Sequence, residues 1–275
     1  MLIVCPTPIG NLEDITLRVL RVLKEADLIL AEDTRHTGRL LQHFGIKNRL
    51  ASFHEHNEKE KSDEIIAALQ QGRQIALVSD AGMPGISDPG AFLIKRVIEK
   101  NLPLQVLPGP NAAVTAYLQS GLIEDHFIFY GFLPRRTKKR RQKLKELKDL
   151  SFPLIFYEAP HRLKDTLRDL LEIFGPRRAA LSRELTKLHE ETVRGTLADI
   201  DAFLQAGPPR GEFVLTVAGA VAEKDEKTEG DIRRALAELL AKGMTRRSAI
   251  TKVSEKYRLP KNRVYEIALT LKTED

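Results

Sequence analysis

Residues 79–90 read Ser-Asp-Ala-Gly-Met-Pro-Gly-Ile-Ser-Asp-Pro-Gly and follow directly on an apolar run that ends at Val78. An apolar, β-branched run that leads into a turn rich in Gly, Pro and Asp is typical of a buried strand that ends in an exposed loop. In open α/β sheets, ligands bind at such loops, at the carboxyl ends of the strands. Glycines let the backbone approach a ligand closely, and prolines hold the loop in shape. We therefore predict a binding site here, rather than a long turn that only reverses the chain.

The composition is that of a globular protein. The chain has 275 residues, of which 30% are charged and 42% hydrophobic, and this length is enough for two domains that each have a core. No apolar run approaches the ~20 residues of a membrane helix, and the first residues read as a strand rather than a signal peptide. The single cysteine, Cys5, excludes an internal disulfide and a cysteine-based zinc site. These features predict a cytoplasmic protein that does not enter a membrane.

Apolar runs alternate with helical patterns along the first 118 residues. The predicted strands are Leu2–Cys5, Leu28–Ala31, Leu50–Phe53, Ile75–Val78 and Leu104–Leu107. Helices are predicted after each strand, at residues 15–25, 37–44, 59–71, 91–100 and 111–120. This order is typical of a mostly parallel sheet that helices cover on both faces.

The alternation starts again near residue 120. Four more predicted strands, at 127–130, 154–157, 179–182 and 213–218, alternate with helices near 137–149, 161–174 and 196–205. We predict two α/β domains, residues 1–118 and 119–222, with mostly parallel or mixed sheets and a ligand cleft between them.

The C-terminal region differs from both predicted domains. Residues 223–230 are almost all polar and read as a linker. Residues 231–275 contain three short helical patterns with a tight turn at 259–262, an order that resembles a helix-turn-helix and favours nucleic-acid binding. The alternative is a helical cap on the second domain.

Positive charge gathers in two segments. Residues 131–150 hold nine Lys or Arg against two Asp or Glu, a local charge of +7, and residues 228–275 hold eleven against seven, a local charge of +4. Since the whole chain carries +6, the remainder carries −5. Two basic patches on a mildly acidic body favour a polyanionic partner, although solvated helix faces would give the same pattern.

The loops after the strands lack two common nucleotide-binding motifs. The first loop, Pro6–Leu12, does not have the Gly-x-Gly-x-x-Gly spacing of dinucleotide-binding enzymes, and no Walker phosphate loop occurs. These absences disfavour hydride transfer and NTP hydrolysis. His54 and His56 lie on one side of an extended segment, but no third ligand accompanies them, so we predict no metal site.

Seven segments of these loops follow one another in order. They are Thr7–Ile15, Ala31–Arg35, Phe53–Asn57, Ser79–Gly90, Pro108–Pro110, Tyr157–Arg162 and Arg183–Lys187. Together they resemble the tetrapyrrole methylase superfamily, whose members use S-adenosylmethionine in a cleft between two α/β domains. More narrowly, the chain resembles the members that methylate the ribose 2′-oxygen of a cytidine in 16S rRNA. The basic C-terminal region resembles the helix-turn-helix extension found on members of this family.

The substrate implied by the resemblance is RNA rather than a tetrapyrrole. Porphyrin-modifying members typically carry a glycine-rich first loop and a Gly-Asp-Pro turn. Here these positions read Thr7-Pro8-Ile9-Gly10 and Ser79-Asp80-Ala81-Gly82. Two alternatives stay open: a methylase of a small acceptor, and a ligand-sensing regulator that binds DNA through its C-terminal helices.

The resemblance implies that S-adenosylmethionine binds along four loops. The predicted cofactor residues are Pro8, Ile9, Gly10, Asp80, Ala81, Gly82, Ile86, Ser87, Tyr157 and Glu158. Methyl transfer to a ribose hydroxyl also needs a group that accepts the hydroxyl proton. The candidates are Lys187, if burial depresses its pKa, and Glu32 or Asp33 as a polarising acceptor.

The expected partner is the 16S rRNA of the small ribosomal subunit, and the resemblance also implies a homodimer. Arg35 and Arg183 are predicted to contact phosphates beside the target nucleotide. The two basic segments are predicted to contact the RNA backbone without reading bases. Their candidate residues are Arg135, Arg136, Lys138, Lys139, Arg140, Arg141, Arg246, Arg247, Lys261 and Arg263.

Overall fold

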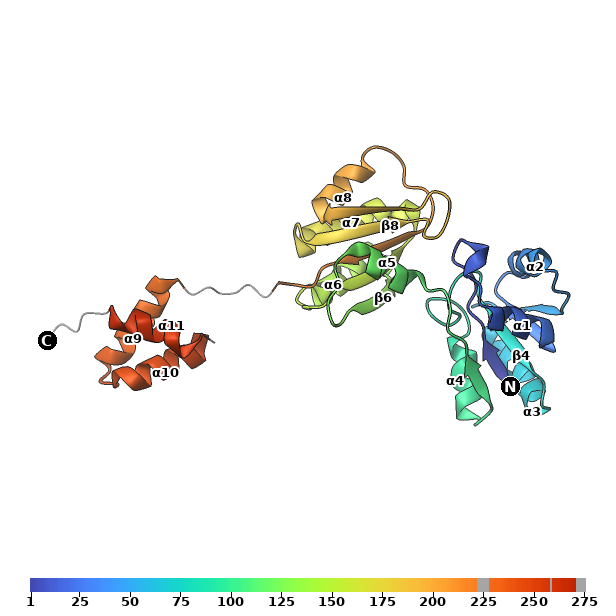
Figure 1. The fold of residues 1–275 in the computed structure, drawn as a ribbon, viewed down its shortest axis with the longest axis horizontal. Coiled ribbons are helices and arrows are strands. Elements are labelled where there is room, and N and C mark those ends of the chain that lie inside the picture. Colours follow the sequence, from blue (N-terminus) through green and yellow to red (C-terminus); the bar gives the residue numbers. More distant parts are fainter. Residues whose placement is uncertain (222–227, 258, 271–275) are drawn as a thin grey trace. The chain divides into compact units, whose positions relative to one another are not determined.

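The structure is a computed structural model that describes residues 1–221, 228–257 and 259–270. Contacts between residues divide the chain into two units, Met1–Ala220 and Val221–Asp275, which we call the body and the helical unit. Figure 1 shows both units as ribbons. Most of the predicted linker, residues 223–227, and the last five residues of the chain lie outside the described residues.

The body contains a first sheet of five parallel strands in the order β3-β2-β4-β1-β5, which confirms the predicted parallel sheet. The strands are β1 (Leu2–Val4), β2 (Leu28–Ala31), β3 (Leu50–Ser52), β4 (Ile75–Val78) and β5 (Leu104–Val106). The 3-10 helix η1 (Leu12–Asp14) and four α-helices connect them. The α-helices are α1 (Leu17–Glu25), α2 (Thr34–His43), α3 (Glu58–Gln70) and α4 (Ala91–Glu99).

Both faces of the first sheet are buried. On one face, Ile3 of β1 belongs to a core with residues of α1 and α2. On the other face, Leu2 and Val4 belong to a core with residues of α3 and α4. Successive strand residues point to opposite faces, so a strand that is covered on both faces must be apolar throughout. Since all five strands are parallel, their carboxyl ends meet at one edge of the sheet.

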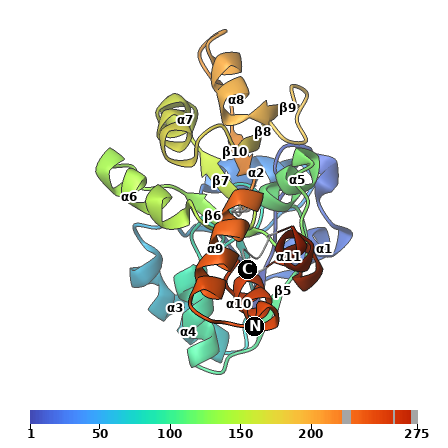
Figure 2. The ribbon, with the colours of Figure 1, turned by 90° about the vertical axis from the view of Figure 1, so that its left-hand side faces the viewer.

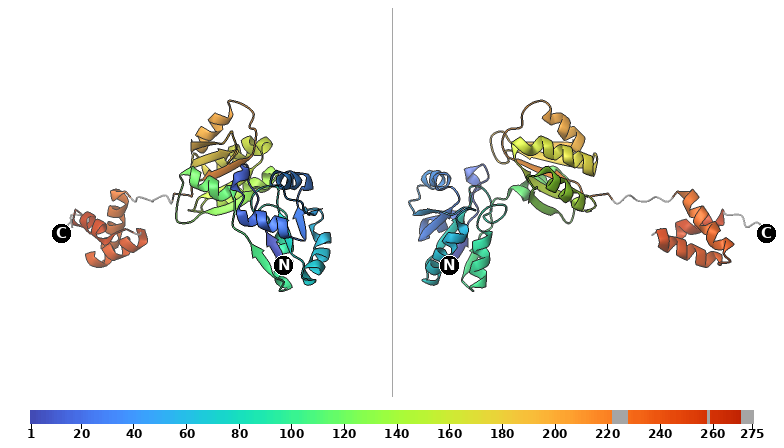
Figure 3. Two further views of the ribbon diagram at one scale, coloured as in Figure 1. Left: turned by 45° about the vertical axis from the view of Figure 1, so that its right-hand side comes forward. Right: turned by 180° about the vertical axis from the view of Figure 1, so that it is seen from behind.

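A second sheet of the body is mixed and runs in the order β6-β7-β10-β8-β9, in which only β6 and β7 pair in parallel. The strands are β6 (Ile128–Phe132), β7 (Leu154–Glu158), β8 (Arg178–Arg183), β9 (Glu191–Thr196) and β10 (Phe213–Val217). The helices α6 (Thr137–Leu147), α7 (Pro160–Phe174) and α8 (Leu197–Leu204) pack on one face, and α5 (Ala112–Ser120) packs on the other (Figure 2). Figure 3 shows the two sheets of the body from two further sides.

The second sheet differs from expectation in two respects. Strand β9 is absent from the predicted elements, because it is an edge strand whose sequence, Glu-Thr-Val-Arg-Gly-Thr, contains a single strongly apolar residue, Val193. Helix α5 falls in the first predicted domain, but Ala113, Ala116 and Tyr117 pack it against the second sheet. Its start is set by Asn111, whose side-chain oxygen accepts hydrogen bonds from the first backbone N–H groups of α5.

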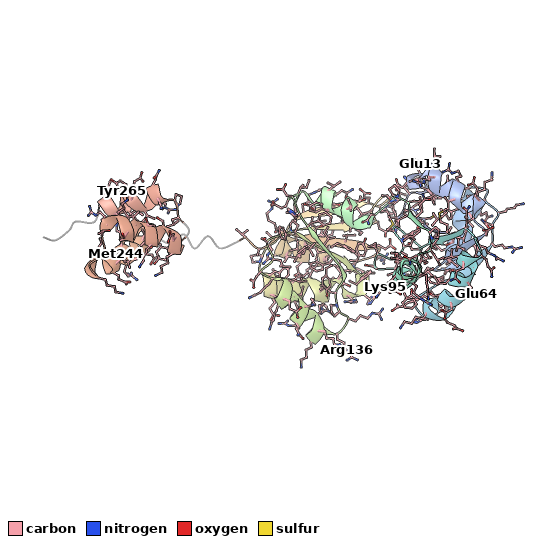
Figure 4. All side chains as sticks on the ribbon, turned by 90° about the horizontal axis from the view of Figure 1, so that it is seen from below. Glu13, Glu64, Lys95, Arg136, Met244 and Tyr265 are labelled. Atoms are coloured by element: carbon pink, nitrogen blue, oxygen red, sulfur yellow. The ribbon has the colours of Figure 1, made fainter. Side chains whose placement is uncertain are left out.

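The helical unit contains the three predicted helices, α9 (Glu229–Ala241), α10 (Arg246–Tyr257) and α11 (Lys261–Leu269). One small core joins them, with Ile232, Val253 and Val264 fully buried. Leu269 has the helical spacing of the core residues but is 57% exposed. Tyr265 of α11 also lies at the surface (Figure 4). Among the described helices of both units, none is long and apolar enough to cross a membrane.

Candidate active site

The loops that follow β1 and β4 lie against each other at the carboxyl edge of the first sheet. Thr7 and Gly82 exchange two backbone hydrogen bonds, of 2.9 and 3.0 Å. The Thr7 hydroxyl also donates to the Ser79 carbonyl oxygen, at 3.0 Å. The 79–90 loop is therefore tied to the first loop by its own hydrogen bonds.

Two glycines join these loops to the second sheet. A Cβ on Gly10 would lie 2.7 Å from the Leu185 carbonyl oxygen and 2.5 Å from Cγ of Lys187. A Cβ on Gly131 of β6 would lie 2.8 Å from Oγ of Ser87. Because only glycine fits at such close approaches, the two contacts hold the loops of one sheet against the elements of the other.

A first pocket of about 310 Å³ is lined by residues from both sides of this contact. Seven of the ten predicted cofactor residues line it: Ile9, Ala81, Gly82, Ile86, Ser87, Tyr157 and Glu158. The residues that the sequence analysis misses are Met83, Asp88, Asn111, Ala112, Phe132, Ala159, Pro160, Leu185, Gly211, Glu212, Phe213 and Val214. Several of them stand in loops that were already predicted to bind a ligand, so loop membership could have found them.

The residues from Gly211 to Val214 escape the sequence analysis for a topological reason. They lead into β10, which runs antiparallel to β7 and pairs Phe213 with Glu158. The amino end of β10 therefore lies beside the carboxyl end of β7. A search confined to the carboxyl ends of strands cannot find such residues.

A β-bulge in β6 turns Phe132 toward the first pocket. Phe129 pairs with Ile155 of β7, but Gly131 pairs with Phe156, so one extra residue stands between them. Phe132 consequently pairs with Tyr157 and shares its face of the sheet, with the two ring centres 5.6 Å apart. Bulges of this kind re-aim side chains beside functional sites.

A second pocket of about 430 Å³ adjoins the first, because Ile9, Ala81 and Glu212 line both. The other three predicted cofactor residues, Pro8, Gly10 and Asp80, line this second pocket. Its remaining walls are Thr7, Leu12, His36, Arg39, Leu40 and Lys187. The second pocket thus combines apolar walls with groups of both charges.

Three carboxyl groups interact at the site: Asp88 of the first pocket, Asp80 of the second, and Glu32, which lines neither pocket. Burial, followed by the charges of Glu32 and Asp80, raises the pKa of Asp88 to about 7, although a hydrogen bond with Ser79 acts in the opposite direction. Burial, followed by the charge of Asp80, also raises the pKa of Glu32. Such a group of carboxylates favours the binding of a positively charged ligand.

Lys187 does not meet the condition on which its predicted role as a base depends. Its ammonium group lies 3.0 Å from the Glu184 carboxylate and 2.9 Å from the Glu212 carboxylate. Burial lowers the pKa of Lys187, but the hydrogen bonds and charges of these two carboxylates outweigh burial and raise it above its ordinary value. Lys187 is therefore held in its protonated form.

Asp33 is also unsuited to accept a proton. Its carboxylate accepts hydrogen bonds from the side chain and the backbone N–H of Arg35, and these hold the pKa of Asp33 well below its usual range. Asp33 also begins helix α2 as its capping residue. Of the two predicted carboxylates, Glu32 alone combines partial burial with a raised pKa.

The carboxylate of Glu158 is engaged within the second sheet and its helices. It accepts hydrogen bonds from the Thr166 hydroxyl, at 2.6 Å, and from the Ala159 backbone N–H, at 2.9 Å. Arg162 lies 3.4 Å from the same carboxylate and donates to the Leu133 carbonyl oxygen at 2.8 Å. Glu158 thus shapes the pocket wall and, through Arg162, positions the basic segment that follows β6.

Most of the predicted RNA contacts lie at the surface. Arg135, Arg136, Lys138 and Lys139 are exposed just before and at the start of α6, and Figure 4 shows Arg136 at the edge of the body. On the helical unit, Arg247, Lys261 and Arg263 are exposed and Arg246 is partly buried. Their exposure is compatible with the predicted contacts to the RNA backbone, which stay a prediction.

The structure corrects the prediction for Arg140. This residue is only 4% exposed, and its guanidinium pairs with the buried Asp169 carboxylate at 2.7 Å. A cation that is buried and paired in this way stabilises the packing of α6 on α7 and cannot contact RNA. Arg141 is partly exposed, but it pairs with Asp169 and Glu172.

The two arginines predicted at phosphates are both paired. Arg35 bonds to Asp33 at 2.8 Å and does not line either pocket. Arg183 bonds to Glu191 of β9 at 2.9 Å. The structure therefore does not bring these two cations to the site.

The sequence matches the model of the family Tetrapyrrole (Corrin/Porphyrin) Methylases over residues 1–201. It is 45% identical to ribosomal RNA small subunit methyltransferase I of Synechocystis sp., over 98% of this chain and 97% of that protein. It is 48% identical to the protein of the same name from Halalkalibacterium halodurans, over 95% of this chain and 92% of that one.

A solved structure shares the fold. Uroporphyrin-III C-methyl transferase from Thermus thermophilus, complexed with S-adenosyl homocysteine, superposes with a TM-score of 0.56 at 16% identity, over 78% of this chain and 96% of that one. The chain belongs to the tetrapyrrole methylase family and, within it, to the group of ribosomal RNA small subunit methyltransferase I.

Proposed function

We propose that the chain transfers a methyl group from S-adenosylmethionine to the ribose 2′-oxygen of a cytidine in the 16S rRNA of the small ribosomal subunit. The names of relatives that are 45% and 48% identical support the class of substrate. The observation that carries the proposal is the pair of adjoining pockets, one with mostly apolar walls and one with charged walls. A methyl donor and an acceptor that bind in adjoining pockets can meet at the residues the pockets share.

The first pocket suits S-adenosylmethionine. Its volume of about 310 Å³ lies within the range of about 300–1,000 Å³ that is usual for ligand sites. Ile9, Tyr157 and Val214 offer apolar surface to a flat ring, and Asp88 offers a carboxyl group to a positive charge. Bound there, the cofactor supplies a methyl group on a positively charged sulfur, which an oxygen nucleophile can take up.

The residues of the chain contribute alignment and proton handling. The close approaches at Gly10 and Gly131 hold the two sides of the site together, so that the bound reactants are kept in register. Glu32 lines neither pocket, but its carboxylate accepts a hydrogen bond from the backbone N–H of Asp80, which lines the second pocket. Because burial raises the pKa of Glu32, this carboxylate is a better base than an ordinary one, and we assign it the proton of the 2′-hydroxyl. Lys187, which its two carboxylates keep protonated, acts as a hydrogen-bond donor in the second pocket.

The RNA partner is supported by the exposed cations near the site. Phe132 lines the first pocket, and Arg135 and Arg136 follow it within four residues. We expect the affinity for RNA to fall steeply with salt, because contacts to phosphates release counterions. The homodimer and the RNA contacts of the helical unit stay predictions, which light scattering and a chain ending at residue 220 would test.

The experiment that tests the function follows a labelled methyl group. The chain is incubated with radiolabelled S-adenosylmethionine and unmodified small ribosomal subunits, and mass spectrometry locates the methyl group. We expect label on the ribose of one cytidine. Label on a base, or transfer to a tetrapyrrole but not to RNA, would contradict the proposal, as would duplex DNA binding without any methyl transfer.

A pair of variants tests Glu32 within the same assay. Glu32→Gln removes the proposed proton acceptor and is expected to lower kcat by about 100-fold or more, with the affinity for S-adenosylmethionine nearly unchanged. Glu64→Gln is the control, because Glu64 is an exposed carboxylate on α3, outside both pockets and outside the loops that follow the strands. An unchanged kcat in Glu32→Gln would remove Glu32 from this role.

A further inference from the structure

Two side chains of α2, a histidine and an arginine, line the second pocket. His36 and Arg39 stand one helical turn apart, and both belong to the pocket wall. Neither is among the residues predicted to contact the target nucleotide. Arg35, which is predicted to do so, precedes them on the same helix but lies outside both pockets.

The charges around the second pocket differ in how far they are already paired. Lys187 is held between Glu184 and Glu212, so its charge is compensated within the body. Asp33 compensates Arg35 in the same way. Arg39 is exposed. Within the residues that the structure describes, no carboxylate lies within ion-pair distance of its guanidinium. Arg39 therefore presents an uncompensated guanidinium to the second pocket.

Four apolar side chains also line the second pocket, beside the polar Thr7 and the carboxylates of Asp80 and Glu212. Pro8 and Ile9 come from the first loop, Leu12 from η1 and Leu40 from α2. Leu12 is exposed, and Leu40 follows Arg39 directly in the chain. An apolar wall beside a guanidinium matches the chemistry of a nucleotide, whose base and sugar are flat or apolar and whose phosphate forms paired hydrogen bonds with arginine.

We propose that the second pocket binds the RNA nucleotide that is methylated, with Arg39, next to His36, bonded to the phosphate that adjoins the target ribose. This inference rests on the proposed function, since it assigns the acceptor side of the same site. A pocket of about 430 Å³ holds one nucleotide rather than a duplex. The nucleotide must therefore be turned out of its stack, as is usual where proteins act on single nucleotides of RNA.

The inference is tested by RNA binding, which needs no turnover. Fluorescence anisotropy measures the affinity of the full chain for an unmodified single-stranded RNA that contains the target nucleotide and its neighbours. S-adenosyl homocysteine is present throughout. We expect Arg39→Ala to weaken binding by about 10- to 100-fold, the usual range for a hydrogen-bonded pair of charged groups. We also expect the slope of log affinity against log salt to become shallower by about 0.7, the value of one phosphate contact on a single strand.

Arg35→Ala is the matched control. Arg35 lies one turn away on the same helix, carries the same charge and is exposed, but it is paired with Asp33 and lines no pocket. We expect it to change neither the affinity nor the slope by more than a small fraction of the Arg39 effect. Equal effects of the two variants would overturn the inference, because they would show a general loss of positive charge.

Two further measurements distinguish a phosphate contact of Arg39 from a contact with the cofactor. Calorimetry should give Arg39→Ala an unchanged affinity for S-adenosylmethionine, and a weakened one would place Arg39 at the cofactor instead. Cytidine 5′-monophosphate should shift the NMR signals of the His36 ring in the wild-type chain, whereas cytidine should not. Equal shifts with both would exclude the phosphate contact. If the wild-type chain transferred no methyl group to RNA, the proposed function would be wrong. The binding results would still decide whether Arg39 contacts a phosphate.

Discussion

Asp88 should make the affinity for S-adenosylmethionine depend on pH near neutrality. This carboxyl group lines the first pocket, and burial together with the charges of Glu32 and Asp80 raises its pKa to about 7. Asp88 lies in the 79–90 loop but is not among the predicted cofactor residues. A positive ligand binds the ionised carboxylate more tightly than the neutral acid. The perturbation that tests this is Asp88→Asn, which keeps the shape of the side chain and removes its charge.

The size of the effect follows from the pKa. With a pKa of about 7, roughly 90% of Asp88 is ionised at pH 8 and roughly 10% at pH 6. If only the ionised form binds the cofactor well, the dissociation constant rises as pH falls, and it is about tenfold larger at pH 6 than at pH 8. The dissociation constant rises, rather than falls, as pH decreases, because the raised pKa of Asp88 means that its carboxylate loses its charge within the neutral range.

The assay is titration calorimetry with S-adenosylmethionine at pH 6, 7 and 8. The amino group of the cofactor also titrates near this range, but it does so equally with wild-type and variant proteins. The quantity to compare is therefore the ratio of the two dissociation constants at each pH. Asp88→Asn should bind more weakly than wild type at pH 8 and nearly equally at pH 6. A ratio that stays constant across the range would refute the reasoning, and Asp125→Asn, at an exposed carboxylate, serves as the control.

Three further substitutions test the packing around the site. Gly10→Ala should lower the free energy of unfolding in urea by about 1–3 kcal/mol and lower the rate of methyl transfer, because the new Cβ would collide with the turn after β8. Gly207→Ala, whose Cβ would meet nothing within 4 Å, should leave both quantities unchanged. Arg140→Ala should cost about 3–5 kcal/mol in urea unfolding by leaving the buried Asp169 without this partner, and a loss below about 1 kcal/mol would contradict the buried pair. Phe132→Ala should weaken the affinity for S-adenosylmethionine by about tenfold in calorimetry, since an aromatic wall is lost, whereas an unchanged affinity would place the ring outside the cofactor site.

The three central strands of the first sheet, β2, β4 and β1, could be predicted from the sequence because they are buried on both faces. Leu2, Ile3 and Val4 all face a core, so the strand reads as an unbroken apolar run. The edge strand β9 gives no such signal, because its residues are at most half-buried and two of them are a glycine and an exposed arginine. The sheet against which α5 packs could not be predicted either, since a helical pattern shows which face is apolar and not what covers it.

The burial of Arg140 could have been predicted from spacing. Leu144 and Leu147 follow it at intervals of four and three residues and are both buried. Arg140 therefore stands on the apolar stripe of α6, where a charged side chain must be paired. The run of cations from Arg135 to Arg141 hides this stripe, because composition alone treats every member of the run as equivalent.

The protonation of Lys187 could not have been predicted, because it depends on the order of strands. Glu184 is local, but Glu212 stands at the start of β10, which pairs with β8 in the second sheet. The same holds for Glu32, whose pKa responds to Asp80 because β2 and β4 are neighbours in the first sheet. Burial is the largest cause of the raised pKa of Glu32 and the charge of Asp80 the next, whereas Glu212 and Glu184 outweigh burial at Lys187. The roles that we propose for Lys187 and Glu32, a hydrogen-bond donor and a base, thus depend on topology acting on side chains that were already candidates from the sequence.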